Sequence, residues 1–315
     1  MPVFRIHHIT RYVYDRPVKE SVNEIRIYPY SSPDQEVLEH DLNITGQPDL
    51  HVFLDYWRNK TADFTVASPH TELIIESKLV VRINSPANAY LNFTSGRDAL
   101  KDEVNDNLHL LELTKTDAID FPADIELILQ HIVQPWKSIA AIVQDCSQYI
   151  YQHFQYIKGI TNIETTVDEI LQHRAGVCQD FAHVMLQILR SLGIPSRYVS
   201  GYICPNKNGM RGEGATHAWV EAWIPQHGWA GIDPTNNVWV TNTHIKLAVG
   251  RNFSDCSPVR GTFKGPARQT LFVHVSLGYE NGHTFEDMNT VKLHAIPSAI
   301  LEDDPGDAFA VQQQQ

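Results

Sequence analysis

Short runs of apolar β-branched and aromatic residues, separated by polar turn-forming clusters, make up the first 85 residues. In the opening segment, every second side chain from Phe4 to Tyr14 falls on one face, as expected for a strand. Five further runs of this kind follow at Val22–Tyr28, Val37–Ile44, Val52–Trp57, Asp63–Val66 and Leu73–Ile83. Many short strands with such punctuation predict a β-sandwich.

The pattern changes to a helical period near residue 138. Apolar residues recur every three or four positions over residues 139–154, and Ser138 is placed to cap the start of that helix. Residues 166–169 have the signature of a capping box, which predicts a second, short helix. An apolar stripe over residues 181–192 predicts a third helix, which ends at Gly193.

Strand signals return after the third helix, at residues 197–203 and 216–224. A short turn and another strand, 229–233, follow directly, so these last two strands should form a hairpin. Further strand signals occur at 238–241 and 270–279. We expect these strands to build a mixed or antiparallel core sheet with helices on one side, an α+β arrangement.

Cys178 stands in the first turn of the third predicted helix, shortly after Gly176. The helix dipole and the unpaired backbone N–H groups at that place favour an anion, and therefore the thiolate form of the side chain. The same N–H groups could stabilise an oxyanion on a substrate carbonyl. Taken alone, a single cysteine is more often a small buried hydrophobic residue. Two downstream residues change that balance.

His217 and Asp233 lie on the two strands of the predicted hairpin. A thiol, an imidazole and a carboxylate are the groups that nucleophilic catalysis needs: a nucleophile, a base and an acceptor that orients the imidazole. Both side chains share a face only if His217 or Trp219 stands opposite Asp233, because a one-residue slip reverses the faces. We therefore predict an odd-numbered turn or a bulge, a His217–Asp233 hydrogen bond of about 2.7–3.2 Å, and a loose Cys178–His217 approach of about 3–4 Å.

Three segments carry a resemblance to a known family: GVCQDFAHVMLQILRSLGIPSRYVSGY, THAWVEAWIPQHGWAGIDPTNN and HIKLAVGRNFSDCSPVRGTFKG. The first two resemble the core of the transglutaminase-like superfamily of papain-related thiol enzymes, and the third resembles the segment after the core in its bacterial members. HHITRYVYDRPV, at the head of the chain, resembles the N-terminal accessory domain of those bacterial proteins. The resemblance implies that Cys178 is the nucleophile, His217 the base and Asp233 the orienting acid.

These observations predict a transglutaminase-like core, with the nucleophile helix packed on an antiparallel sheet, preceded by an all-β sandwich. We place the sandwich at residues 1–85, a linker and the start of the core at 86–137, and the catalytic core at 138–280. Residues 281–315 form a C-terminal extension, whose acidic and glutamine-rich end we expect to be a loose tail from residue 300.

Composition limits the classes of partner. The 315 residues carry a net charge of −12, which argues against nucleic acids and anionic membranes, because both need basic patches. The N-terminus lacks the pattern of a signal peptide, and no apolar run is long enough to span a bilayer. The four cysteines are widely spaced and do not indicate a disulfide framework. We therefore expect a cytoplasmic protein.

No cofactor or metal site is predicted. The chain lacks HExxH, Walker and dinucleotide-binding motifs, and no Cys–His pair has zinc spacing. We expect Asp180 to have a structural role. For Trp219 and Trp223 two roles are equally favoured, lining a substrate groove and packing in the core. A second oxyanion donor is not identified; Gln134 and Trp136 are candidates by their place upstream of the nucleophile.

Three functions compete. The favoured one is hydrolysis of a peptide or isopeptide-type amide through a thioester, because the resemblance is to the bacterial branch, whose members are commonly described as cysteine proteases. The second is transglutamination, the same acylation followed by transfer to an amine; the triad alone does not separate the two. The third is a non-catalytic scaffold, which the intact triad disfavours. No EF-hand loop is present, so calcium control is not supported.

Overall fold

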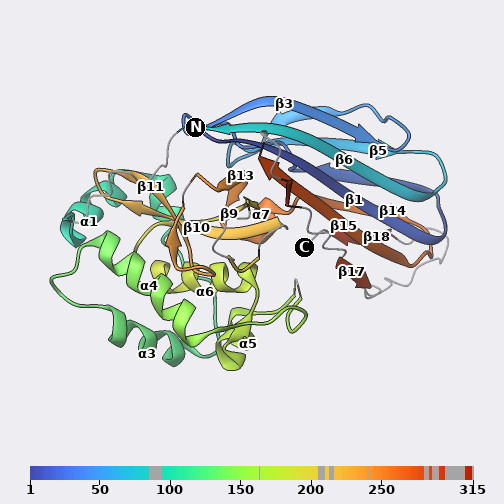
Figure 1. Ribbon diagram of the computed structural model, residues 1–315. Helices are drawn as coiled ribbons and strands as arrows, with labels where there is room; N and C mark the ends of the chain where they lie inside the picture. Colours follow the sequence, from blue (N-terminus) through green and yellow to red (C-terminus); the bar gives the residue numbers. More distant parts are fainter. Residues whose placement is uncertain are drawn as a thin grey trace.

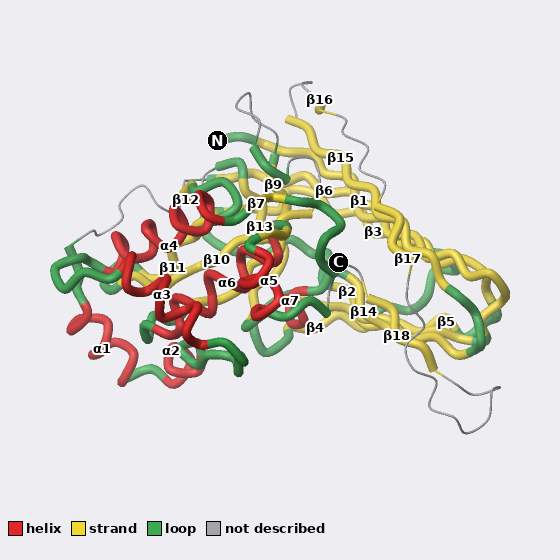
Figure 2. The backbone as a smooth tube through the Cα atoms, turned by 90° about the horizontal axis from the view of Figure 1, so that it is seen from below, coloured by secondary structure: helices red, strands yellow, loops and turns green. Residues whose placement is uncertain are grey.

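Two β-sheets form a sandwich at one end of the molecule, and a third sheet with the helices forms the other end (Figures 1 and 2). The structure, a computed structural model, describes residues 1–84, 94–162, 164–204, 210–212, 216–240, 242–279, 284–285, 291–294 and 309–313. The first sandwich sheet has the order β16 (Thr284–Phe285), β15 (Gln269–Tyr279), β1 (Val3–Val18), β6 (His70–Ile83) and β3 (Gln35–Ile44), and β17 (Val291–His294) also pairs with β15. The second has the order β18 (Phe309–Gln313), β14 (Val259–Lys264), β2 (Glu20–Ile25), β5 (Lys60–Val66) and β4 (His51–Leu54).

The sandwich draws on both halves of the chain and extends beyond the predicted residues 1–85. Strand β15 pairs with β1 along its whole length, from Tyr279 opposite Phe4 to Gln269 opposite Tyr14, and β14 pairs with β2. The prediction that residues 270–279 belong to the core sheet is therefore wrong. A period of two identifies a strand with one buried face, but it does not identify the sheet that the strand joins.

The end of the chain also differs from its prediction. Residues 309–313, which we expected in a loose tail, form β18 and pair with β14. Phe309 and Val311 are of strand-forming type, and the segment pairs with the edge of β14 in spite of its polar composition. The rest of the predicted tail, residues 300–308 and 314–315, lies outside the described residues.

The third sheet has the order β12 (Val238–Trp239), β11 (Gly228–Asp233), β10 (Thr216–Ile224), β9 (Ser196–Ile203) and β13 (His244–Gly250), and all of its neighbours are antiparallel. The helices are α1 (Arg97–Asn105), α2 (Leu108–Glu112), α3 (Pro122–Ile132), α4 (Ile139–His153), α5 (Val167–His173), α6 (Cys178–Ser191) and α7 (Phe253–Cys256). This confirms the predicted α+β core. In the part of the chain that the structure describes, no helix is long and apolar enough to cross a membrane.

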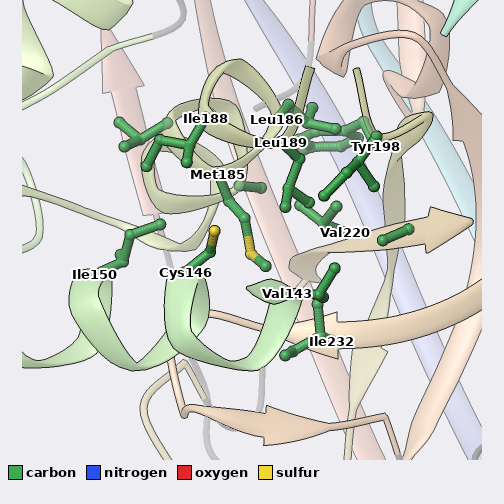
Figure 3. Packing of buried hydrophobic residues seen from close by; sticks show 14 of the residues in the cluster. Val143, Cys146, Ile150, Met185, Leu186, Ile188, Leu189, Tyr198, Val220 and Ile232 are labelled. Carbon is green, nitrogen blue, oxygen red and sulfur yellow. The ribbon is translucent and has the colours of Figure 1, made fainter. Parts of the chain in front are cut away.

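One face of the third sheet packs against the helices. Val220 of β10 and Ile232 of β11 lie in one hydrophobic cluster with Met185 of α6, and with Val143 and Cys146 of α4 (Figure 3). All five side chains are completely buried. Burying a side chain of this size contributes about 1.5–3 kcal/mol, so this layer fixes α6 on the hairpin. Cys146 is a core residue, as its place in the apolar stripe predicts.

The third sheet also packs on the sandwich. Tyr202, Ile245 and Leu247 belong to the hydrophobic core of the sandwich although they come from β9 and β13. The Tyr202 hydroxyl also hydrogen-bonds the Nδ1 atom of His8 on β1 at 2.6 Å. His7, its neighbour on β1, turns the other way and contacts Glu76 at 2.7 Å, so the two histidines do not share a ligand. On the face away from the helices, Val199, Trp219 and Val249 form a buried cluster against Tyr30 and Trp57, which come from loops between sandwich strands.

The segment before α4, which the sequence left unassigned, contains three helices. The predicted boundary at residues 85–88 lies outside the described residues. Helix α1 contributes Glu103, whose carboxylate accepts hydrogen bonds from the Trp223 indole at 2.6 Å and from the Gln226 backbone N–H at 3.0 Å. These bonds hold the end of the β10–β11 hairpin.

A fragment of residues 1–84 should not fold by itself. It keeps β1 to β6 but loses β14 and β15, so both sandwich sheets lose a central partner strand. Thermal unfolding followed by circular dichroism should show no cooperative transition for the fragment and a clear one for the full chain. A cooperative transition of the fragment would show that the C-terminal strands are not needed for the sandwich.

Candidate active site

Cys178 is the first residue of α6 and is partly exposed, as the sequence predicts. Just before it, β8 (Ala175–Gly176) pairs in parallel with β7 (Gln155–Tyr156), which places Tyr156 beside the nucleophile loop. The Asp180 carboxylate accepts hydrogen bonds from the Val177 N–H at 2.7 Å and from the Thr161 hydroxyl at 2.6 Å. Asp180 therefore has the expected structural role of fixing the chain on both sides of the thiol.

Glycine is required at position 176. A Cβ atom there would lie 2.5 Å from Oδ2 of Asp180, far closer than atoms can approach. Any side chain at this position would displace the Asp180 carboxylate from the Val177 N–H. The motif Gly-Val-Cys-Gln-Asp thus works as a unit, in which the glycine makes room for the carboxylate that sets the start of α6.

The hairpin register brings His217 and Asp233 together. Ile224 pairs with Gly228 and Val220 with Ile232, which places Trp219 opposite Asp233. The turn between the paired ends has three residues, Pro225 to His227. This confirms the predicted register, in which an odd-numbered turn puts the histidine and the aspartate diagonally on one face.

His217 donates from Nε2 to Oδ2 of Asp233 at 2.8 Å, within the predicted range, and both side chains are completely buried. Burial lowers the pKa of His217, but the Asp233 carboxylate and then the Cys178 side chain raise it more strongly, to about 10. Nδ1 is therefore the nitrogen that faces the thiol, although it makes no hydrogen bond of normal geometry with any described residue. The separation of about 3–4 Å between Cys178 and His217 stays a prediction.

Asp233 accepts four hydrogen bonds. Besides His217, Oδ2 accepts from the Asn236 amide at 2.7 Å and contacts Nε2 of His244 at 3.4 Å, and Oδ1 accepts from the Thr235 N–H at 2.9 Å. Burial raises the pKa of Asp233, but His217 and His244 lower it well below the usual range. The carboxylate is therefore ionised although no water reaches it.

Two residues bound to Asp233, His244 and Asn236, were not predicted from the sequence. His244 is completely buried, and burial lowers its pKa in spite of the hydrogen bond to Asp233, so it is a neutral donor beside the charged pair. Its only sequence signal was its place at the head of the third family-like segment. Asn236 follows Asp233 by three residues, a spacing that turns often use for side-chain contacts.

His217, Asp233 and His244 are also the described residues best placed to hold a metal ion, since their ligand atoms lie within 4.8 Å of one another. A tetrahedral metal ion bound to both residues, with bonds of about 2.0–2.2 Å, would hold Nε2 of His217 and Oδ2 of Asp233 farther apart than the 2.8 Å that separates them. Oδ2 of Asp233 also already accepts three N–H groups. These three residues are therefore arranged to hydrogen-bond one another, and their spacing does not suit a metal ion.

Trp219 packs in the core instead of lining a groove. It is completely buried, and its ring stacks against His217 with centroids 6.4 Å apart. Gly201, directly opposite His217 on β9, makes this possible, because a Cβ there would lie 2.6 Å from the Trp219 ring. Trp223 instead bonds Glu103 and packs against Trp229 at 5.3 Å.

The two candidates for a second oxyanion donor gain no support. Trp136 has 79% of its surface exposed, and no described contact brings Trp136 or Gln134 to Cys178. Tyr156 is better placed: burial raises the pKa of its hydroxyl, and Cys178 and Asp233 raise it further, so it stays a protonated donor beside the thiol. The other cysteines, Cys146, Cys204 and Cys256, are all buried.

Comparison with known proteins identifies the family. Residues 128–234 match the model of the transglutaminase-like superfamily, and residues 4–82 match that of the bacterial transglutaminase-like N-terminal region. An uncharacterized protein of Mycobacterium leprae is 33% identical over 279 residues, covering 87% of this chain and 97% of its own. A protein-glutamine gamma-glutamyltransferase of Pseudomonas aeruginosa is 34% identical over 112 residues, which are 33% of this chain and 16% of that enzyme.

The fold is also found in a solved structure. A proposed cysteine protease from Cytophaga hutchinsonii superimposes with a TM-score of 0.71 at 19% identity, over 99% of this chain and 98% of its own. The similarity therefore extends across the sandwich and the core, in agreement with the predicted fold class.

Iodoacetamide should alkylate Cys178 before the other three cysteines. Cys178 is partly exposed, whereas burial raises the pKa of the thiols of Cys146, Cys204 and Cys256. Mass mapping of labelled peptides at short times gives the order. Faster labelling of any of the three buried cysteines would contradict the assignment of Cys178 as the reactive thiol.

The imidazolium of His217 should persist to a pH of about 10. Asp233→Asn removes a carboxylate that raises this pKa, so the midpoint should fall in the variant. Nitrogen NMR of the histidine rings measures both titrations. Glu36→Gln, which removes an exposed carboxylate of the sandwich, should leave the midpoint in place. An equal midpoint in wild type and Asp233→Asn would mean that the two groups are not coupled.

Proposed function

Because the chain belongs to the transglutaminase-like superfamily, we propose that it is a cysteine hydrolase that cleaves a peptide or isopeptide-type amide through a thioester. The observation that carries the proposal is the hairpin register, which pairs His217 with Asp233; the partly exposed Cys178 is near enough to help raise the pKa of His217. In this proposal Cys178 is the nucleophile, His217 the acid–base group and Asp233 the residue that orients the imidazole.

The reaction begins with a thiolate–imidazolium pair. The sulfur of Cys178 attacks the scissile carbonyl carbon, and backbone N–H groups at the start of α6 receive the oxyanion. The imidazolium of His217 then gives its Nδ1 proton to the leaving amine as the C–N bond breaks, which leaves a thioester on Cys178. Asp233 stays ionised throughout and keeps the ring in place from the Nε2 side.

Water completes the cycle in a hydrolase. The neutral His217 takes a proton from water, the hydroxide oxygen attacks the thioester carbonyl, and the acid product leaves as the thiolate and imidazolium are restored. An acyl-enzyme that water can reach hydrolyses unless an amine competes, which supports hydrolysis as the default outcome. The four cysteines are unpaired, and this suits the reducing cytoplasm that we propose as its location.

Protein-glutamine transamidation is the second candidate. Its support is the similarity to the Pseudomonas aeruginosa enzyme, whose name describes that activity, over 112 residues. The acyl-enzyme is identical in both reactions, so the candidates differ only in the group that attacks the thioester.

A peptide library incubated with and without a primary amine separates the two. Hydrolysis should yield shortened or deamidated peptides in both samples, whereas transamidation should yield peptides that carry the amine. Cys178→Ala should remove either product completely, and Asp233→Ala should lower kcat by about 10⁴-fold, with circular dichroism used to measure the folded fraction of each variant. Product that survives Cys178→Ala would place the nucleophile elsewhere. If the wild-type protein forms no product, the result would favour the third function, a non-catalytic scaffold.

A further inference from the structure

Arg211 lies beside the candidate active site with a charge that no described residue neutralises. Its guanidinium stacks on the ring of Tyr151, with Cζ 4.3 Å from the ring centre. Its Nη1 atom is buried and has no hydrogen-bond partner among the described residues. Arg211 as a whole is half-buried, whereas two buried arginines among the described residues are paired: Arg197 bonds Glu221, and Arg190 donates to the carbonyl of Ser196.

The backbone of Arg211 is fixed to the triad by one side chain. The side-chain Oδ1 of Asn236 accepts from the Arg211 backbone N–H at 2.7 Å, and the side-chain Nδ2 of Asn236 donates to the Arg211 backbone carbonyl at 3.1 Å. The same amide also donates to Oδ2 of Asp233 at 2.7 Å. Asn236 thus fixes the position of Arg211 relative to the carboxylate of the triad.

Gly212, the next residue in the chain, lies against the imidazole of His217. At Gly212, which has a φ of +81°, an added Cβ would lie 2.9 Å from Nδ1 of His217 and 3.6 Å from the Tyr156 hydroxyl. Nδ1 is the nitrogen that faces Cys178. Arg211 is also near enough to Tyr156 to lower the pKa of its hydroxyl against the effects of burial, Cys178 and Asp233. The guanidinium therefore belongs to the immediate surroundings of the thiol.

Stacking on Tyr151 uses the flat face of the guanidinium and leaves Nη1, at its edge, without a partner among the described residues. A fork of N–H groups in that plane matches the two oxygens of a carboxylate, and such charge-assisted pairs are among the stronger hydrogen bonds. A buried N–H without a partner is costly, so a bound anion would be favoured at this place. The chain as a whole is acidic, with a net charge of −12, so the positive charge at the active site does not follow from the overall composition.

We propose that Arg211 binds a carboxylate of the substrate close to the scissile amide. This rests on the proposed hydrolase function and names its substrate class: amides with a carboxylate within about two residues of the bond that is cleaved, given the reach of an extended chain. The carboxylate belongs either to an acidic side chain or to the end of a peptide chain. Both present the same two oxygens to the guanidinium.

Matched peptide pairs test the proposal and separate the two sources. One pair carries glutamate or glutamine next to the scissile amide, and the other ends in a free carboxylate or a carboxamide. Wild type should cleave the charged member of one pair with a kcat/KM about ten- to a hundred-fold higher. Arg211→Met should remove the preference by slowing only the charged member, and Arg211→Lys should retain part of it, because lysine keeps the charge without the fork.

Arg174→Met is the matched control. Arg174 also stacks on an aromatic ring, that of Phe154 at 5.1 Å, but it has no described contact with the Asp233 network. This variant should keep the full preference. Equal cleavage of both members by wild type, or an equal loss on both members in Arg211→Met, would overturn the carboxylate site.

Alkylation gives a readout that does not need amide hydrolysis. Iodoacetate and iodoacetamide differ by a carboxylate, so the ratio of their rates at Cys178 reports a nearby cation. The ratio should fall at least about three-fold in Arg211→Met and stay unchanged in Arg174→Met. An unchanged ratio in Arg211→Met would overturn the proposal. A fall in the ratio without cleavage of any peptide would support the carboxylate site and contradict the hydrolase.

Discussion

The structure of the candidate site depends on the buried carboxylate of Asp233. An ion of this kind costs several kcal/mol to remove from water, and it is stable in the interior only when hydrogen bonds replace the lost hydration. Asp233 receives such bonds from His217, Asn236, Thr235 and His244. The four donors come from three places, so the carboxylate fixes β10, the turn after β11 and the start of β13 relative to one another.

The two histidines beside this carboxylate differ in charge: His217 is protonated and His244 is neutral. The nearer one, His217, has its pKa raised to about 10, while burial lowers the pKa of His244. Linkage sets the pH range of the pair. The raised pKa of His217 gives stabilisation that is full below about pH 6.5 and is lost up to about pH 10. The lowered pKa of Asp233 gives stabilisation that is present above about pH 3.8 and is lost as the pH falls. A neutral His244 adds a hydrogen bond without competing for the negative charge.

Local sequence was sufficient to place Cys178, His217 and Asp233 on their helix and strands, but not to predict the residues around them. The helix start at Cys178 and the strand period around His217 are local signals, and the parity of the hairpin turn follows from them. His244 reaches Asp233 only because β13 pairs with β9, which is a long-range choice that no local period encodes. For the same reason β15 was assigned to the wrong sheet. The short helices before α4, such as the five residues of α2, are too short for a clear periodic signal.

The sandwich is part of the support of the site instead of a separate module. A sheet whose two faces are apolar needs a layer on each, and the helices cover only the face that contains Val220. Loops between sandwich strands cover the other face, where Tyr30 and Trp57 pack on Trp219, whose ring lies beside Gly201, the residue opposite His217. The bond from Tyr202 to His8 then joins β1 to β9 at 2.6 Å. A displacement of β1 would therefore reach the strand next to the imidazole, and this explains why one chain contains both parts.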